Sequence, residues 1–415
     1  MSNKERITPQ EAPQRIPILE GDRTLWMIYA VLIVVSILVV YSSTAKMAYD
    51  ITSSLTTTES LRQQIMLILV MSVPVIFVAH KVNFTFYHRW AGAMYWLMVI
   101  LTVATYFVGS TTNGAARWLP IGPFQFQPSE ILKVCTIVML ARSMADRQTT
   151  IDKIKLIPTS FRLGDPKQRQ IIRENTWPLL GPVVVSCGVI APAHISSAVI
   201  VGIASMLTLY IGRVSRRELV KTLGFGVACA VVGFTLLSLV GMGRGDTALT
   251  RLTRWMTEMT TDSKKEYVYE LSDTERAMIA IRNGGLTGEG AGHSTSRAVV
   301  IHPESDYAYA FFASEYGVVA ALMLMLLYLW ITFRSIEICR RCTTAFPTLM
   351  AAGLGLLITC QAMLHILVQV NLFPETGQTL PLISRGGSSL LSMSLALGMI
   401  ISVSRMPSAT PTTKH

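Results

Sequence analysis

Long apolar stretches alternate with short polar segments along most of this 415-residue chain. A helix of roughly 20 apolar residues can cross about 30 Å of hydrocarbon, because it satisfies its backbone polar groups without water. The pattern predicts ten such helices, of which the fourth, fifth and sixth are short for a span. Their predicted ranges are 25–43, 65–80, 90–109, 130–145, 177–193, 197–212, 220–243, 310–333, 348–370 and 388–403. We therefore predict an all-α integral membrane protein whose membrane domain covers residues 25–405.

Basic residues between the apolar stretches predict how the chain is oriented. Lys and Arg in short loops resist translocation, so they mark the cytoplasmic side. With a cytoplasmic N-terminus, four returns to the cytoplasm carry the basic residues, at 81–89, 142–173, 213–221 and 334–341. We predict a flexible cytoplasmic tail at residues 1–24, a basic cytoplasmic loop at 142–176 near anionic membrane lipid, and a second cytoplasmic tail at 406–415.

One polar segment, residues 244–309, is much longer than the others and falls between the seventh and eighth predicted helices. The orientation above puts it outside the membrane. Loops longer than ~12–15 residues are usually functional or disordered. Because this segment mixes Trp255, Tyr267 and Tyr269 with a glycine-rich stretch, we predict a large, structured extracytoplasmic loop.

The composition agrees with a chain that is largely surrounded by lipid. Apolar residues make up 51% of the sequence and charged residues 15%, which disfavours a soluble protein. The formal net charge is +11, but the basic residues are scattered among short loops, so we predict no nucleic-acid partner. The six cysteines lie mostly within apolar runs and indicate no disulfide framework. Cys339 and Cys342 have no second Cys or His pair in the nearby sequence that would complete a zinc site.

Four segments that depart from simple span composition all fall on the predicted outer side, which argues for one site. The first contains Arg117 and Trp118 and continues to Pro128, followed by Glu130 and Lys133. Pro128 favours the start of a helix, on which Glu130 and Lys133 share a face. These two form either an internal ion pair or a polar floor for an anionic headgroup. Arg117 is either a pyrophosphate clamp or an interfacial anchor.

The second segment, residues 283–297, is rich in glycine and has a GxGxxG-like spacing. It follows no predicted strand and lies outside, so a dinucleotide-binding fold is excluded. A tight loop or a close backbone approach to a ligand remains. The third segment, residues 302–307, contains Asp306, with Glu304 two residues before it. Desolvation at the mouth of a membrane helix suits Asp306 to act as a base, and capping of the next helix is the alternative.

The fourth segment, residues 374–389, combines prolines and glycines near membrane depth. Such backbone is tolerated only where it faces a cavity or packed protein. Gly386, Gly387, Ser388 and Ser389 either offer backbone N–H groups to phosphate oxygens or form a close helix-packing turn.

Together these segments resemble the SEDS family (shape, elongation, division and sporulation) of ten-span peptidoglycan glycosyltransferases. The resemblance covers nearly the whole chain after about residue 22 and rests on GAARWLPIG with QPSEILK, NGGLTGEGAG, PESDYAYAFFASEYG and TGQTLPLISRGGSSL. It implies a processive enzyme that polymerises lipid II on the outer face of the bacterial cytoplasmic membrane, inverts the anomeric centre and releases undecaprenyl pyrophosphate. TGQTLPLIS and the N-terminal tail are more similar to the division branch, FtsW, than to the elongation branch, RodA, which implies a role at the division septum.

The resemblance also implies residue roles and partners. The family's essential aspartate corresponds to Asp306, as the catalytic base. The implied substrate-binding residues are Arg117, Trp118, Glu130, Lys133, Glu304, Glu315, Ser384, Arg385, Gly386, Gly387 and Ser388. The implied partners are lipid II, a class B penicillin-binding protein that acts as transpeptidase, and other division proteins. No resident cofactor is expected, and assistance by a divalent cation is left open.

The chain departs from the family pattern at three places. The spacing from Pro303 to Asp306 is shorter than usual, so the assignment of Asp306 depends on a gap. Residues 191–197 lack the carboxylate of the family's Q-P-D-L-G-T, and Arg385 replaces the tyrosine that usually precedes Gly-Gly-Ser-Ser.

Two rival functions also fit the sequence. A transporter of lipid-linked substrate is suggested by charged or titratable residues in or near spans, namely Glu130, Lys133, Glu315 and His365. A non-catalytic scaffold for division proteins is suggested by the cytoplasmic tail and the basic loop.

Overall fold

The computed structural model describes residues 19–44, 57–112, 115–121, 124–157, 166–239, 245–260 and 271–405. Most of the predicted N-terminal tail and all of the predicted C-terminal tail lie outside the described residues, as do parts of the predicted loops at 142–176 and 244–309.

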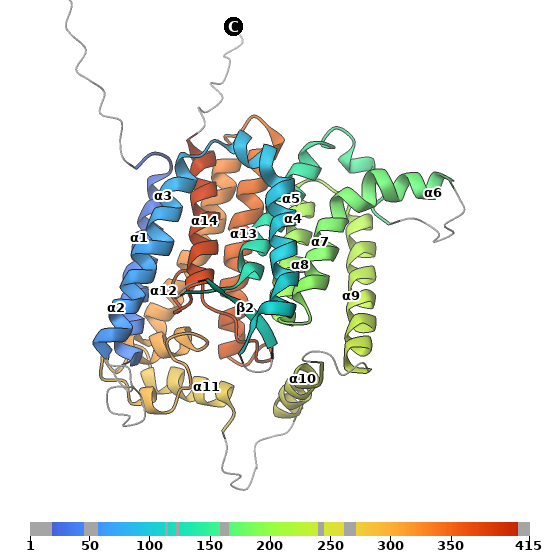
Figure 1. Ribbon diagram of the computed structural model, residues 1–415. Helices are drawn as coiled ribbons and strands as arrows, with labels where there is room; N and C mark the ends of the chain where they lie inside the picture. The colour runs from blue at the N-terminus through green and yellow to red at the C-terminus, as the bar shows by residue number, and fades with distance from the viewer. Residues whose placement is uncertain are drawn as a thin grey trace, which may run out of the picture.

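Helices make up most of the described chain (Figure 1). They are α1 (Arg23–Ser43), α2 (Thr57–Leu67), α3 (Val73–Lys81), α4 (Phe84–Val108), α5 (Pro128–Ala145), α6 (Pro166–Ile171), α7 (Trp177–Ile190), α8 (Ile195–Ile211), α9 (Arg216–Leu239), α10 (Gly245–Thr260), α11 (Asp273–Gly284), α12 (Ala308–Cys339), α13 (Ala345–Gln369) and α14 (Gly387–Ser404). The π-helical turns η2 (Ile68–Ser72) and η4 (Ile172–Thr176) join α2 to α3 and α6 to α7, and the short 3-10 turns are η3 (Ile151–Lys153) and η5 (Thr295–Ala298).

Among the described residues, six helices are long and apolar enough to cross a membrane: Arg23–Ser43, Thr58–Lys81, Phe84–Val108, Ala308–Cys339, Ala345–Gln369 and Gly387–Ser404. The apolar helix α8 is shorter. This confirms the prediction of a mostly helical membrane protein. The ranges predicted for the remaining spans overlap α5, α7, α8 and α9. That these four also cross the membrane stays a prediction, as does the total of ten.

A small antiparallel sheet, which the all-α prediction did not include, lies between α4 and α5. It consists of β1 (Ser110–Thr112), β2 (Ala115–Ile121) and β3 (Phe124–Phe126), in the order β1-β2-β3. Two residues separate the paired ends Thr112 and Ala115. They are Asn-Gly, the dipeptide that most favours a two-residue hairpin. That signal was available in the sequence.

The connections between helices divide between the two ends of the bundle (Figure 1). The α3–α4, α8–α9 and α12–α13 connections and the described parts of the segment between α5 and α7 lie at the end where α14 finishes. The sheet, α10, α11 and the start of α12 lie at the opposite end. The basic segments thus share one end of the bundle, as the charge pattern predicts. Which end faces the cytoplasm stays a prediction.

Helices α5, α13 and α14 form the centre of the bundle. In the apolar windows of α13 and α14, 78% of residues are buried, against 22–44% in the other helices of span length. α5 is buried along most of its length and packs against α4, α13, α7, α8 and α14. Polar side chains on α5 and α13 therefore meet protein instead of lipid, which is where charged groups are tolerated in a membrane.

The glycine-rich second segment packs against a break in α12. Gly317 interrupts that helix with φ of +81°. A Cβ atom at Gly317 would lie 2.2 Å from the carbonyl oxygen of Leu286, and one at Gly288 would lie 2.1 Å from that of Glu315. Such distances leave no room for a side chain. The backbones of the segment and of α12 touch here, which supports the tight-loop interpretation of this sequence.

Candidate active site

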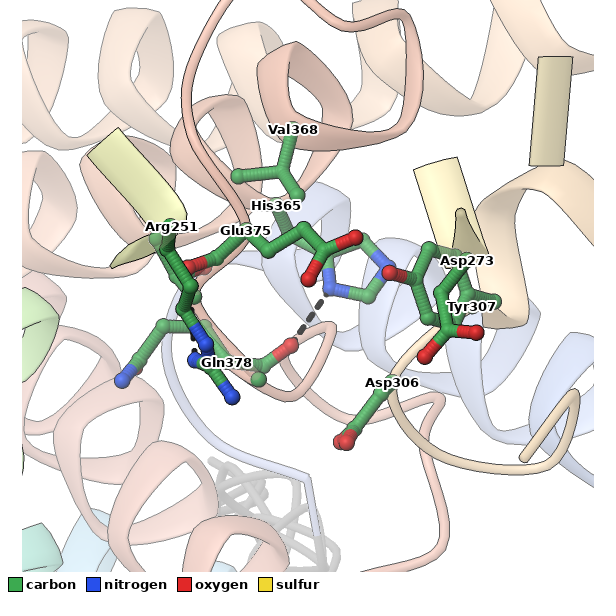
Figure 2. A pocket seen from close by; sticks show the side chains of 10 residues that line it. Arg251, Asp273, Asp306, Tyr307, His365, Val368, Glu375 and Gln378 are labelled. Carbon is green, nitrogen blue, oxygen red and sulfur yellow. Dashed lines mark hydrogen bonds between the residues drawn. The ribbon is translucent and has the colours of Figure 1, made fainter. Parts of the chain in front are cut away.

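Asp306 lies in the turn just before α12 and lines a cavity of about 70 Å³. The turn lies at the end of the bundle that holds the sheet, α10 and α11. The cavity is bordered by residues from α10, α11, α13 and the segment that joins α13 to α14 (Figure 2). Besides Asp306 they are Arg251, Asp273, Tyr307, His365, Val368, Glu375, Thr376, Gly377 and Gln378. The predicted outer loop and the fourth segment therefore meet around Asp306.

The Asp306 carboxylate borders the cavity and does not cap α12. Tyr307, and not Asp306, is the N-cap residue of α12, and no side-chain capping bond is made there. The hydrogen bond that the Asp306 carboxylate accepts comes from the neighbouring Ser305 hydroxyl, at 3.4 Å. The carboxylate is thus left with acceptor capacity facing the cavity.

Burial raises the pKa of Asp306 above its ordinary value. The charge of His302, the Ser305 hydroxyl and the charge of Arg117 oppose this rise but do not cancel it, while the neighbouring charge of Glu304 adds to it. A carboxylate with a raised pKa is a better proton acceptor, which is what a catalytic base requires.

The surroundings of Glu304 shift its pKa in the opposite direction to that of Asp306. Burial alone would raise its pKa, but the interaction with His302 and the charge of Arg385 hold the pKa below its ordinary value. The His302 Nδ1 atom lies 3.7 Å from the Glu304 Oε1 atom, and Glu304 in turn raises the pKa of His302. Two carboxylates two residues apart therefore differ in their affinity for a proton, and Asp306 is the one suited to exchange it.

The end of the fourth segment docks onto the turn that carries Asp306. The Ser384 hydroxyl donates to the carbonyl oxygen of Ser305 at 2.6 Å, and the Arg385 backbone N–H donates to that of Glu304 at 2.8 Å. The Arg385 guanidinium bonds to the side-chain oxygen of Gln63. Ser384 and Arg385 thus contact the turn that carries Asp306, and their contact with substrate stays a prediction.

Glu130 and Lys133 form a buried ion pair on α5, with 2.8 Å between the Lys133 Nζ and Glu130 Oε1 atoms. Lys133 is fully buried and also donates to Gln361 of α13 at 2.7 Å. The internal ion pair that links this helix to a neighbour, one of the two alternatives above, is therefore present. Neither residue borders the Asp306 cavity. Gln361 in turn donates to the Thr379 carbonyl oxygen, which links the pair to the fourth segment.

The glycine–serine turn opens α14. Gly386 is the N-cap of that helix and Gly387 its first residue. The Ser388 hydroxyl accepts from the Gln127 backbone N–H at 2.8 Å, which ties the start of α14 to the start of α5. The helix-packing alternative for this turn is thus observed. Phosphate binding by its backbone N–H groups stays a prediction.

The remaining predicted residues lie in two places. Arg117 and Trp118 are half-buried on β2. The charge of Arg117 acts to lower the pKa of Asp306. Glu315 lies on α12, two residues before the break at Gly317, and is fully buried. Its Oε1 atom accepts from the Ser42 hydroxyl and the Gly292 N–H, and Arg297 lies 3.4 Å away. The contacts of Glu315 hold the glycine-rich segment, and its part in substrate binding stays a prediction.

Sequence reasoning missed several residues that border the cavity, above all Arg251. Arg251 lies on α10, and its guanidinium donates to the Glu375 carbonyl oxygen at 3.4 Å. Trp255, one turn later, donates to the Asn371 carbonyl oxygen at 3.1 Å, so α10 is fastened to the segment after α13. A signal existed: arginines and apolar residues alternate at helical spacing over 245–260, which predicts a helix lying against another surface.

Comparisons with known proteins agree with this architecture. A family model described as "Cell cycle protein", which groups FtsW, RodA and SpoVE, matches residues 22–409. The chain belongs to this family. The resemblance identified from the motifs is thereby confirmed, and with it a place in a membrane-protein family of cell-wall synthesis.

Curated relatives of this FtsW/RodA/SpoVE protein come from several branches. The peptidoglycan glycosyltransferase MrdB of Escherichia coli is 28% identical over 92% of this chain and 93% of its own. A probable peptidoglycan glycosyltransferase FtsW of Caulobacter vibrioides is 28% identical over 76% of this chain and 72% of its own. Stage V sporulation protein E of Bacillus subtilis is 27% identical over 92% of this chain. Identities this similar do not decide which branch the chain belongs to.

Solved structures share the fold. A peptidoglycan synthase complex that coordinates polymerization and crosslinking contains a chain with a TM-score of 0.64 and 19% identity, over 93% of this chain and 98% of that chain. The rod shape determining protein RodA of Thermus thermophilus gives a TM-score of 0.58 and 20% identity over 93% of this chain and 97% of that chain.

Proposed function

We propose that this protein is a peptidoglycan glycosyltransferase that polymerises lipid II into glycan strands on the outer face of the bacterial cytoplasmic membrane. The observation that carries the proposal is Asp306: a carboxylate whose pKa is raised by burial, facing a small polar cavity at the end of the bundle away from the basic segments. The names of the curated relatives support the same reaction.

The geometry supports a single displacement. Asp306 takes the proton from the 4-hydroxyl of the acceptor sugar, and the freed oxygen attacks the anomeric carbon of the donor. The bond from that carbon to the pyrophosphate oxygen breaks, its electron pair leaves with undecaprenyl pyrophosphate, and the anomeric centre inverts. A pyrophosphate leaves as a stable anion, so one carboxylate base and nearby cations suffice.

Arg251 is the cation that the cavity offers to the leaving group. In the part of the chain that the structure describes, no three His, Cys, Asp or Glu side chains are grouped so that they could hold a metal ion. We assign the stabilisation of the leaving pyrophosphate to Arg251. Arg117, whose charge reaches Asp306, is the second cation of the site.

The partner and the place in the cell follow from the family. We infer that a class B penicillin-binding protein, which crosslinks the new strand, binds this protein, since a similar structure is that of a complex that coordinates the two reactions. The motif TGQTLPLIS favours action with other division proteins at the septum. Both termini are proposed to be cytoplasmic, because the basic segments share the end where α14 finishes.

A polymerisation assay tests the function. Purified protein, alone and with its transpeptidase partner in vesicles, is incubated with lipid II, and glycan chains and released undecaprenyl pyrophosphate are measured. Both products are expected. Movement of headgroups across the vesicle membrane without polymer would identify a transporter, and rescue of a depletion strain by an inactive Asp306 variant would identify a scaffold.

Replacing His302 by Ala is expected to move the acidic limb of kcat/KM to higher pH. Asp306 must be ionised to act, so activity is lost as pH falls through its pKa. His302, protonated in that range, lowers the pKa of Asp306, and its removal lets this pKa rise further. The measurement is polymerisation rate against pH. The control is His293→Ala, which removes an exposed histidine of the glycine-rich segment. An acidic limb that does not move in His302→Ala would contradict the assignment of Asp306 as the base whose pKa sets that limb.

Replacing Arg251 by Ala is expected to lower kcat about 10- to 100-fold, because a cation that faces the leaving group stabilises charge that develops only in the transition state. Arg254→Ala is the matched control, since Arg254 is exposed on the same helix and does not border the cavity. It is expected to stay close to wild type. Equal losses in both variants would remove Arg251 from the site and leave α10 with a structural role.

A further inference from the structure

Three consecutive carbonyl oxygens in the turn before α12 each accept a hydrogen bond from the last third of the chain. Glu304 accepts from the Arg385 N–H at 2.8 Å and Ser305 from the Ser384 hydroxyl at 2.6 Å. Asp306 accepts from the Nε2 atom of Gln369 at 3.2 Å. The first two donors belong to a connecting segment, whereas Gln369 is part of helix α13. The backbone of Asp306 itself is therefore held by a side chain on a rigid element.

The Gln369 side chain bonds both to the turn before α12 and to the first turn of α12. Its side chain is fully buried, and its Oε1 atom accepts from the backbone N–H of Ala310. This N–H lies in the first turn of α12, where backbone donors have no partner within the helix. One amide group thus joins the carbonyl of Asp306 to the first turn of the helix that follows. The two bonds fix the direction in which the Asp306 side chain leaves the backbone.

His365, one turn earlier on α13 and almost fully buried, sets the orientation of the Gln369 amide. The His365 Nδ1 atom lies 2.6 Å from the carbonyl oxygen of Gln378, which can only accept, so Nδ1 carries the proton. The other ring nitrogen then accepts from the Gln369 amide nitrogen. That bond directs the NH₂ group of Gln369 toward His365 and Asp306 and its oxygen toward Ala310.

The same histidine also fixes the segment that passes the carboxylate. Gly377 has φ of +58°, and a Cβ atom there would lie 3.6 Å from the Asp306 Oδ2 atom, so the backbone approaches the carboxylate closely. Gln378, whose carbonyl is held by His365, donates through its side chain to the Ser196 and Ser197 hydroxyls at 2.9 Å each. Residues 191–197, which depart from the family pattern, are thereby connected to the network.

We propose that Gln369, oriented by His365, is a positioning residue for the Asp306 base, an inference that rests on the proposed glycosyltransferase function. Gln369 does not border the cavity and acts through the backbone of Asp306, whereas His365 and Gln378 border the cavity and join the network to α8. The network specifies where the carboxylate points when the acceptor sugar arrives. Its loss leaves the base present but misplaced.

The test compares Gln369→Leu with Gln64→Leu in the lipid II polymerisation assay. Gln64 is an equally buried glutamine whose amide bonds to Ser36 away from the cavity, so it controls for the loss of a buried amide. Gln369→Leu is expected to lower kcat about 10- to 100-fold with little change in KM, because a small misplacement of a catalytic group costs this much. Its acidic limb moves to lower pH, since a freed turn exposes the carboxylate. Gln64→Leu keeps the wild-type kcat and acidic limb.

Gln369→Glu distinguishes the positioning of Asp306 by Gln369 from the capping of α12 by Gln369. It also replaces Gln369→Leu as the test if that variant does not fold. Ionised Glu still accepts from the Ala310 N–H but cannot donate to the Asp306 carbonyl or to His365. The inference predicts a loss of kcat as large as in the Leu variant. Wild-type kcat and acidic limb in Gln369→Glu would overturn it. If Asp306→Asn is inactive while the Gln369 variants behave like wild type, Asp306 remains the proposed base and only the positioning role of Gln369 is wrong. If Asp306→Asn is fully active, Asp306 is not the base, and the proposed mechanism is wrong together with this inference.

Discussion

Asp306→Asn is expected to lower lipid II polymerisation about 1,000-fold while the protein still folds and binds its partner. Asn keeps the shape of the side chain and can still accept the hydrogen bond from Ser305, but it cannot take up a proton. General-base catalysis contributes about 100- to 10,000-fold to a rate. Burial raises the pKa of Asp306, which makes its carboxylate a better proton acceptor. The measurement is the initial rate of glycan formation at equal protein amounts.

Two control variants sharpen this experiment. Asp152→Asn makes the same change at an exposed aspartate on the basic, opposite end of the bundle, and it is expected to leave the rate unchanged. Asp273→Asn removes a different carboxylate from the border of the same cavity. A loss as large as that of Asp306→Asn would show that the charge of the cavity, and not a particular base, matters. A normal rate in Asp306→Asn itself would end the proposed mechanism.

The helical membrane fold could be predicted from the sequence because it depends on local properties. Six predicted spans correspond to helices of span length and hydropathy, since apolar runs must form helices wherever lipid surrounds them. The pairing of Glu130 with Lys133 was likewise available, because residues three apart share a helix face. The sheet of residues 110–126 was missed, although Asn-Gly before β2 favours a hairpin, because short strands carry a weak pattern beside long spans.

The candidate site was predicted only in part, for a physical reason. Asp306 and Glu304 were found because they lie in a polar segment that interrupts the apolar pattern, whereas Ser384 and Arg385 were assigned from the family resemblance. His365 drew notice as a titratable group in a predicted span but was not connected to Asp306. Arg251 and Gln369 lie outside the recognised motifs, and the bonds that connect them to this region reach 59 or more positions along the sequence, as the bond from the Ala310 N–H to the Gln369 side chain illustrates. Glu375 and Gln378 lie within the fourth segment, but nothing in the sequence indicated that they border the same cavity as Asp306.

Lys133→Met is expected to lower the free energy of unfolding by about 3–5 kcal/mol, the typical cost of leaving a buried charge without its partner. Lys133 is fully buried and only 6% of Glu130 is exposed, so water cannot replace the lost ammonium group. In the described residues the Glu130 Oε2 atom has no hydrogen-bond partner even with Lys133 in place, which leaves the carboxylate dependent on that single cation. The change in the free energy of unfolding is measured by titrating the protein, held in mild detergent, with a denaturing detergent and following its unfolding.

The double variant Glu130→Gln with Lys133→Met identifies the cause of that loss. When both charges are removed, no unpaired ion remains in the interior, so the double variant is expected to be more stable than Lys133→Met alone. A matched control is Lys221→Met, which breaks an ion pair with Glu218 of the same i, i+3 spacing and the same 2.8 Å distance. The Lys221 side chain is 61% exposed, so its loss is expected to cost at most about 1 kcal/mol. If the double variant were the least stable of all, packing by the Lys133 side chain, and not charge pairing, would hold α5 against α13.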